Sequence, residues 1–192
     1  MYTPKAFAER FGPQQSDLVV AILGASYLDA LLEDLLMTRV IADRRSNVVT
    51  RPGFARRAET AFALGLLSRD SLDDLHAIAE IRNYFAHKVL DAEASFRDSE
   101  VTALSAKLSS SRAAADPESR SVMKEWGYEV DNPRALFIEA MTACASELAH
   151  RIEHAPEVGV PEAEPTGRLG LIEWQAVAEI VRRLDARDSK KR

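Results

Sequence analysis

The stretch DLVVAILGASYLDALLEDLLMTRVI, residues 17–41, decides the fold of this chain. Its apolar residues occupy nearly every side of a helix, so it predicts a central helix that is buried almost all round. Ser16 lies directly before this stretch, and its hydroxyl can cap the first turn. Three acidic residues, Asp29, Glu33 and Asp34, interrupt the apolar run and argue against a membrane span.

The remaining pattern is also helical. Gly and Pro number eight each, and no alternating run of β-branched residues predicts a strand. We therefore predict an all-α fold. The further expected helices are Phe54–Leu66, Ser71–Phe85, a short helix that Asp98 starts, and a helix from Arg134 to about Glu153 that Asn132 and Pro133 begin. Ser71 with Asp74 resembles a capping box, and the small, polar stretch Ser109–Asp116 predicts a loop.

The chain of 192 residues is long enough for one domain with a substantial core. We assign residues 1–154 to a helical domain and residues 155–170, with three prolines and three glycines, to a linker. Residues 171–192 are expected to form an amphipathic helix, Leu171–Arg187, and a basic tail. The single cysteine, Cys144, excludes an intramolecular disulfide, and residues 1–12 lack the apolar core of a signal peptide. These features predict a cytoplasmic protein.

The hexapeptide RNYFAH, residues 82–87, carries the densest group of chemically active side chains. Arg82 can clamp an anion with two hydrogen bonds, and His87 can move a proton near neutral pH. Asn83 and His87 are four residues apart and share a helix face, whereas Arg82 lies about 140° around the helix from His87. A joint site therefore requires the helix to end near His87, or a second subunit to complete the geometry.

Two stretches resemble the mannitol operon repressor-like family: LVVAILGASYLDALLE at residues 18–33, and FALGLLS at residues 62–68 followed by residues 78–87. The resemblance covers about residues 17–153. That family is similar to a branch of the all-helical HEPN superfamily, which implies a HEPN-like bundle of about five core helices with the C-terminal helix as an appendage. Many HEPN members are ribonucleases of toxin–antitoxin and phage-defence systems.

The HEPN signature is an arginine, a polar residue, a spacer and a histidine, and Arg82, Asn83 and His87 match it. One HEPN subgroup is regulated through a tyrosine two residues after the histidine. Here that position is Val89, so this mode of control is not expected.

The matched residues suit metal-independent RNA cleavage, in which the RNA 2′-hydroxyl attacks the adjacent phosphorus. His87 would act as acid or base, Arg82 would hold the charge developing on the phosphate, and Asn83 would orient a partner. One histidine does not readily serve as acid and base in the same step, so we expect a homodimer. Asp29 or Glu33 is expected to orient Arg82. No metal or cofactor is expected, because the four histidines form no metal-binding motif.

RNA contacts are expected from the basic segment Arg39–Arg57, where arginine dominates. The candidates are Arg44, Arg45, Arg51, Arg56 and Arg57. A solvated loop paired with acidic residues elsewhere explains these arginines equally well. Tyr84 is expected to support the site by packing, and base stacking is the alternative. A purely structural interpretation remains for the motif, with Arg82 paired to Glu80 or Asp73 and His87 capping its helix.

Three hypotheses for the function therefore remain open. The first is a dimeric endoribonuclease of HEPN type that acts as a toxin or phage-defence effector, with RNA as substrate and an antitoxin as partner. The alternative is a non-catalytic, mannitol-repressor-like transcriptional regulator that acts through a protein partner. Direct DNA binding is not expected, because the net charge is −5 and no helix-turn-helix with a basic recognition helix is visible. A third hypothesis is an interaction module that docks through its last helix.

Overall fold

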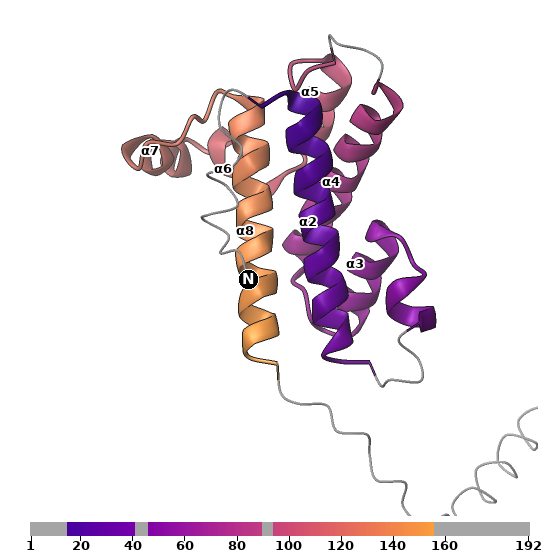
Figure 1. Cartoon of the computed structure of the whole chain (residues 1–192). Coiled ribbons are helices and arrows are strands. Elements are labelled where there is room, and N and C mark those ends of the chain that lie inside the picture. The colour runs from indigo at the N-terminus through magenta and orange to yellow at the C-terminus, as the bar shows by residue number, and fades with distance from the viewer. Residues whose placement is uncertain (1–14, 41–45, 90–93, 156–192) are drawn as a thin grey trace, which may run out of the picture. The chain divides into compact units, whose positions relative to one another are not determined.

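The computed structural model describes residues 15–40, 46–89 and 94–155 (Figure 1). These ranges contain helices and no strand, so the predicted all-α fold is confirmed for this part of the chain. The elements are α2 (Asp17–Met37), the π-helix η2 (Ser46–Thr50), α3 (Phe54–Ala63), α4 (Arg69–His87), α5 (Ser99–Ser105), α6 (Ser109–Ala115), α7 (Pro117–Glu125) and α8 (Pro133–Glu153). The predicted linker and the helix Leu171–Arg187 lie outside the described residues.

Helix α2 is the centre of the bundle, as the sequence predicted. The Ser16 hydroxyl accepts a hydrogen bond from the Val19 N–H (3.3 Å) and starts the helix. Side chains such as Leu28 and Leu32 are fully buried against α3, α4 and α8. The helix ends at Met37, before the expected Ile41, which lies outside the described residues.

Helices α2 and α8 run parallel, and α4 runs antiparallel to both (Figure 1). At the start of the parallel pair, Arg134 of α8 forms an ion pair with Asp17 of α2 (3.3 Å). The antiparallel direction of α4 is seen at its start, where Ser71 donates a hydrogen bond to Glu147 near the end of α8. Gly24 allows close approach, since a Cβ there would lie 2.1 Å from the Met141 sulfur of α8.

A row of aromatic rings fastens the end of α4 to the start of α8. The Phe85 ring lies 5.1 Å from that of Phe96, which lies 4.9 Å from that of Phe137, and all three are buried. Phe96 belongs to the connection before α5, and its N–H donates to Asp17 of α2 (3.0 Å). The row therefore joins three helices and the loop between them.

The start of α4 differs from the predicted capping box at Ser71 and Asp74. Ser68 is the N-cap, and its hydroxyl accepts the Ser71 N–H (3.1 Å). Asp74 does not cap the helix. Its buried carboxylate instead accepts hydrogen bonds from the N–H (2.7 Å) and the hydroxyl of Ser109 in α6. Burial raises the pKa of Asp74, although these hydrogen bonds oppose the effect.

The prediction of a loop at Ser109–Asp116 is wrong, because Ser109–Ala115 forms α6. The serines that suggested a loop instead bond to neighbouring helices, and Ser110 donates to the Leu136 carbonyl (2.7 Å). Helix α7 follows directly, with Asp116 as N-cap and Pro117 in its first turn. Cys144 is buried in the core. No described helix has the length and hydropathy needed to cross a membrane.

Candidate functional site

The C-terminal end of α4 presents the predicted motif to solvent. Ile81 and Phe85 face the core and fix the rotation of the helix, so that Arg82, Asn83 and His87 are exposed on the opposite side. His87 is the last residue of the helix and Lys88 is its C-cap, so the expected helix end is confirmed. The helix dipole favours positive charge at this end.

Arg82 and His87 make few internal contacts. Arg82 donates to the side-chain oxygen of Asn83 (3.0 Å) and forms no ion pair within the described part of the chain. Its proposed structural partners are already engaged, since Asp73 pairs with Arg69 (3.3 Å) and Glu80 with Lys107 (2.9 Å). The alternative prediction, in which Arg82 pairs with Glu80 or Asp73, is therefore wrong. The His87 ring has no hydrogen bond to another described residue.

The motif of a single copy forms an open face and not an enclosed site. Because all three side chains are exposed, a phosphate held by Arg82 would stay in water beside His87. A second surface is needed to exclude that water and to supply a second acid or base. The exposed face of one copy therefore lacks the enclosure that a catalytic site would need.

Tyr84 supports the motif by packing. Its ring stacks edge-on to that of Phe85 (5.5 Å), and the Lys88 ammonium lies 4.9 Å from the ring centre. Its hydroxyl donates to Asp98 (2.6 Å), a hydrogen bond that raises the pKa of Tyr84 and lowers the pKa of Asp98. With its ring buried, Tyr84 is not available as a base-stacking platform.

Asp29 and Glu33 engage a different arginine from the one expected. Both pair with Arg57 of α3, and the distance from the Arg57 guanidinium to the Glu33 carboxylate is 3.4 Å. Arg57 also donates to the carbonyls of Val49 (2.7 Å) and Thr50 (3.3 Å). The prediction that Arg57 contacts RNA is therefore corrected, because its buried guanidinium ties α2, η2 and α3 together.

The other predicted RNA-binding arginines do not form a described cluster. Arg51 and Arg56 are exposed, and Arg56 pairs with Glu59 on its own helix (3.1 Å). Arg44 and Arg45 lie outside the described residues. Among the residues that are described, no group of three potential ligands is placed to hold a metal ion.

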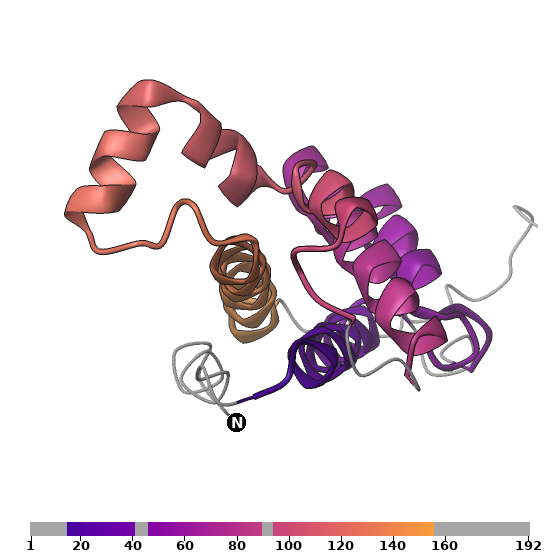
Figure 2. The same ribbon diagram turned by 90° about the horizontal axis from the view of Figure 1, so that it is seen from above.

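A second surface, at α7, was missed by the sequence reasoning. Helix α7 buries none of its own residues, and the views in Figures 1 and 2 show it standing off to one side of α8. Three large side chains at this helix and its exit are exposed: Val122 (40%), Trp126 (73%) and Tyr128 (38%). We call these three residues the α7 patch.

Polar interactions fix the conformation of residues 116–131, which we call the α7 arm. The Asp116 carboxylate accepts the Ser119 N–H (2.8 Å), and Arg120 pairs with Asp131 across the arm. Gly127 reverses the chain after the helix with a φ of +84°, which glycine adopts without strain. The arm therefore keeps its form without burying the α7 patch. The signal in the sequence was the spacing of Val122 and Trp126, four residues apart at the end of a mostly polar helix.

Comparison with known proteins supports the fold. No family model matches the sequence, and no curated protein matches it. A chain from the X-ray structure of the MtlR–HPr complex from Escherichia coli matches with a TM-score of 0.54 and 15% sequence identity, over 76% of this chain and 98% of that chain. The fold is therefore MtlR-like, as the resemblance implied. At this identity the likeness concerns the fold alone, and the HEPN assignment stays a prediction.

Proposed function

We propose that this protein is a non-catalytic, mannitol-repressor-like transcriptional regulator that acts by binding a protein partner through the α7 patch. The exposure of Trp126 carries this proposal, because large aromatic side chains on a surface are enriched at the centres of protein interfaces. The shared fold gives independent support, since the matched chain belongs to a complex of MtlR with HPr. The fold likeness alone would not assign a function.

The charges around the α7 patch define the chemistry of the partner. Residues 116–131 hold five acidic and two basic side chains. A segment with this excess of acidic side chains complements a folded protein whose apolar patch is bordered by lysine and arginine. The same negative charge disfavours nucleic acid at this surface. We therefore propose a protein partner with a basic rim, whose association slows as the salt concentration rises.

Replacement of Trp126 by serine is the direct test of this surface. A photo-cross-linking residue at position 122 would first identify the partner in cells of the source organism. With that partner purified, we expect Trp126→Ser to raise the dissociation constant by about 30-fold or more, because a central aromatic anchor is lost. Titration calorimetry measures the change, and transcript profiles of a strain carrying Trp126→Ser should match those of a deletion strain.

Leu23→Ser is the matched control, because Leu23 is also an exposed apolar residue (55%) and lies on α2. It should bind the partner within about twofold of the wild type, since surface residues outside an interface contribute little. Equal binding by Trp126→Ser and the wild type would overturn the α7 patch as the docking surface. Transcript profiles unchanged by deletion would overturn the regulatory role itself.

Ribonuclease activity is the second candidate function, and the free state of Arg82 and His87 favours it. An arginine and a histidine that lack internal ion pairs in the described structure remain available for a phosphate. Two copies that face each other through α4 would supply one histidine as acid and the other as base. This homodimeric site would need no metal and would cut RNA by attack of the 2′-hydroxyl.

Cleavage of RNA by the purified protein in EDTA tests this candidate. If the protein is a ribonuclease, we expect His87→Ala to lower the rate by about 1,000-fold, because proton transfer at the reacting oxygen is lost. His76→Ala replaces another histidine of α4, one that belongs neither to the motif nor to the α7 patch, and should leave the rate unchanged. Cleavage that survives His87→Ala would come from another group or a contaminant, and inert wild-type protein would exclude this function for the substrates tested.

A further inference from the structure

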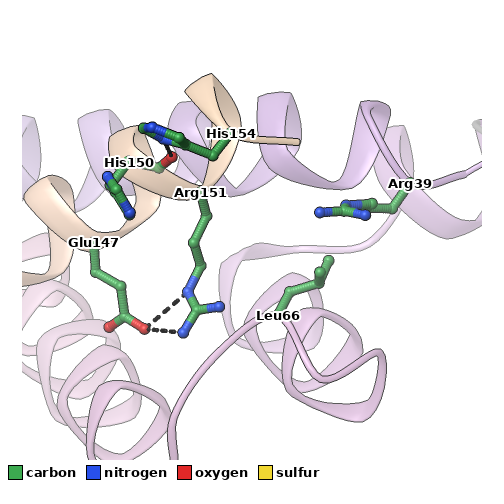
Figure 3. A pocket seen from close by; sticks show the side chains of 6 residues that line it. All are labelled: Arg39, Leu66, Glu147, His150, Arg151 and His154. Atoms are coloured by element: carbon green, nitrogen blue, oxygen red, sulfur yellow. Dashed lines mark hydrogen bonds and ion pairs between the residues drawn. The ribbon is translucent and has the colours of Figure 1, made fainter. Parts of the chain in front are cut away.

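A pocket lies at the opposite end of the bundle from His87. Its walls come from the exit of α2, the connection between α3 and α4, and the last turns of α8 (Figure 3). The volume is about 350 Å³, which is the size of a small-molecule site. The lining residues are Arg39, Leu66, Glu147, His150, Arg151 and His154. None belongs to the α4 motif or the α7 patch.

The charge of Glu147, the acidic residue of the pocket, is compensated by Arg151 of the same pocket. One oxygen of Glu147 accepts hydrogen bonds from Arg151 Nε (3.0 Å) and Nη2 (2.8 Å). Its other oxygen accepts a hydrogen bond from the hydroxyl of Ser71. Glu147 and Arg151 therefore form a satisfied pair, as Figure 3 shows, and Glu147 is not free to compensate a second cation.

Arg39 is the uncompensated cation of the pocket. Its Nε atom is buried without a hydrogen-bond partner, and no ion pair joins it to another described residue. With two arginines and one glutamate in the lining, one positive charge is in excess before either histidine takes up a proton. A buried charged donor without a partner is costly, so an anionic ligand that accepts from Arg39 would relieve that cost.

Two histidines line the same pocket as Arg39. The rings of His150 and His154 lie 4.1 Å apart, and His154 Nδ1 lies 2.8 Å from the His150 carbonyl. Because a carbonyl only accepts, His154 Nδ1 carries a proton and its Nε2 remains available to a ligand. The excess positive charge of the pocket would attract a doubly charged anion more strongly than a singly charged carboxylate.

We propose that this pocket binds a small phosphate monoester. The phosphate would accept hydrogen bonds from the Arg39 guanidinium, whose planar fork fits two phosphate oxygens, and from the neighbouring imidazoles. Leu66 supplies an apolar wall for the organic part of the ligand. The site is distinct from the α7 patch, so it would give a regulator of this kind a place for a phosphorylated effector.

Nuclear magnetic resonance of the histidine rings tests this proposal on the full-length protein. Glycerol 3-phosphate and inorganic phosphate are titrated separately at constant ionic strength, with acetate as the carboxylate comparison. We expect saturable shifts of the His150 and His154 signals with the phosphate probes and weaker binding of acetate. Tighter binding of glycerol 3-phosphate than of inorganic phosphate identifies an organic monoester as the ligand, and the reverse order identifies free phosphate.

Arg39→Gln should weaken phosphate binding by about tenfold or more, because a charge-assisted pair of hydrogen bonds is lost. Arg56→Gln removes an exposed arginine on α3 and should leave the affinity within about twofold. Circular dichroism confirms that both variants are folded. No saturable shift of either histidine, equal binding by Arg39→Gln, or acetate as tight as phosphate would overturn the proposal. None of these outcomes depends on whether the α7 patch binds a protein.

Discussion

Phe85→Ala is expected to lower the free energy of unfolding by about 4 kcal/mol. Phe85 is fully buried and touches both Tyr84 of its own helix and Phe96 of the following loop. Its removal leaves a cavity at the point where α4, the loop and α8 are joined, and the rings of Phe96 and Phe137 lose the support beside them. Urea unfolding followed by circular dichroism measures the change.

Trp126→Ser is the control for this substitution, because it also removes a large aromatic side chain but from an exposed position. It should change the free energy of unfolding by less than about 0.5 kcal/mol. A loss of less than about 1.5 kcal/mol for Phe85→Ala would mean that the aromatic row does not hold α4 to α8.

Arg57→Met is expected to destabilise the protein by about 3 kcal/mol. The substitution keeps most of the side-chain volume but removes the guanidinium that faces Asp29 and Glu33. These two carboxylates then repel each other across one turn of α2, and two backbone carbonyls lose their donor. We expect a destabilisation at the lower end of the range for a broken buried ion pair, because the Asp29 and Glu33 side chains are 34% and 35% exposed and water can partly solvate them. Thermal and urea unfolding measure the loss.

The adjacent Arg56→Met is its matched control. The Arg56 side chain is 75% exposed and pairs only with Glu59 of the same helix, so a change below about 0.5 kcal/mol is expected. If both variants were equally stable, the Arg57 network would contribute nothing measurable. In that case α3 would be held to α2 by apolar packing alone.

The long helices were predictable because their signals are local. Ser16 and Asn132 are N-caps that stand directly before long apolar runs, and the structure starts α2 and α8 where these residues indicate. Helices α6 and α7 were not found because each is shorter than ten residues and has little apolar content. In such segments, hydrogen bonds to other helices decide the structure, as Ser109 and Ser110 show.

The candidate site was predictable in its position but not in its partners. The pattern placed Arg82, Asn83 and His87 at the end of a helix, and the structure confirms that position. Arg56 is exposed and Arg57 is buried, although they are neighbours in the sequence. Consecutive residues of a helix point about 100° apart, so which of the two is buried depends on which side of α3 faces α2. The pairing of Asp29 and Glu33 follows from that rotation, so it required the tertiary structure.

The order of the helices along the chain has a consequence for biosynthesis. Among the described helices, α2 is made before the others, yet one of its main packing partners is α8, and the whole stretch from Thr38 to Asn132 lies between them. During translation, the part of the apolar surface of α2 that packs against α8 therefore stays uncovered until α8 has left the ribosome. Contacts between segments so distant in sequence slow folding and leave nascent chains open to aggregation. The last described helix thus completes the burial of the first.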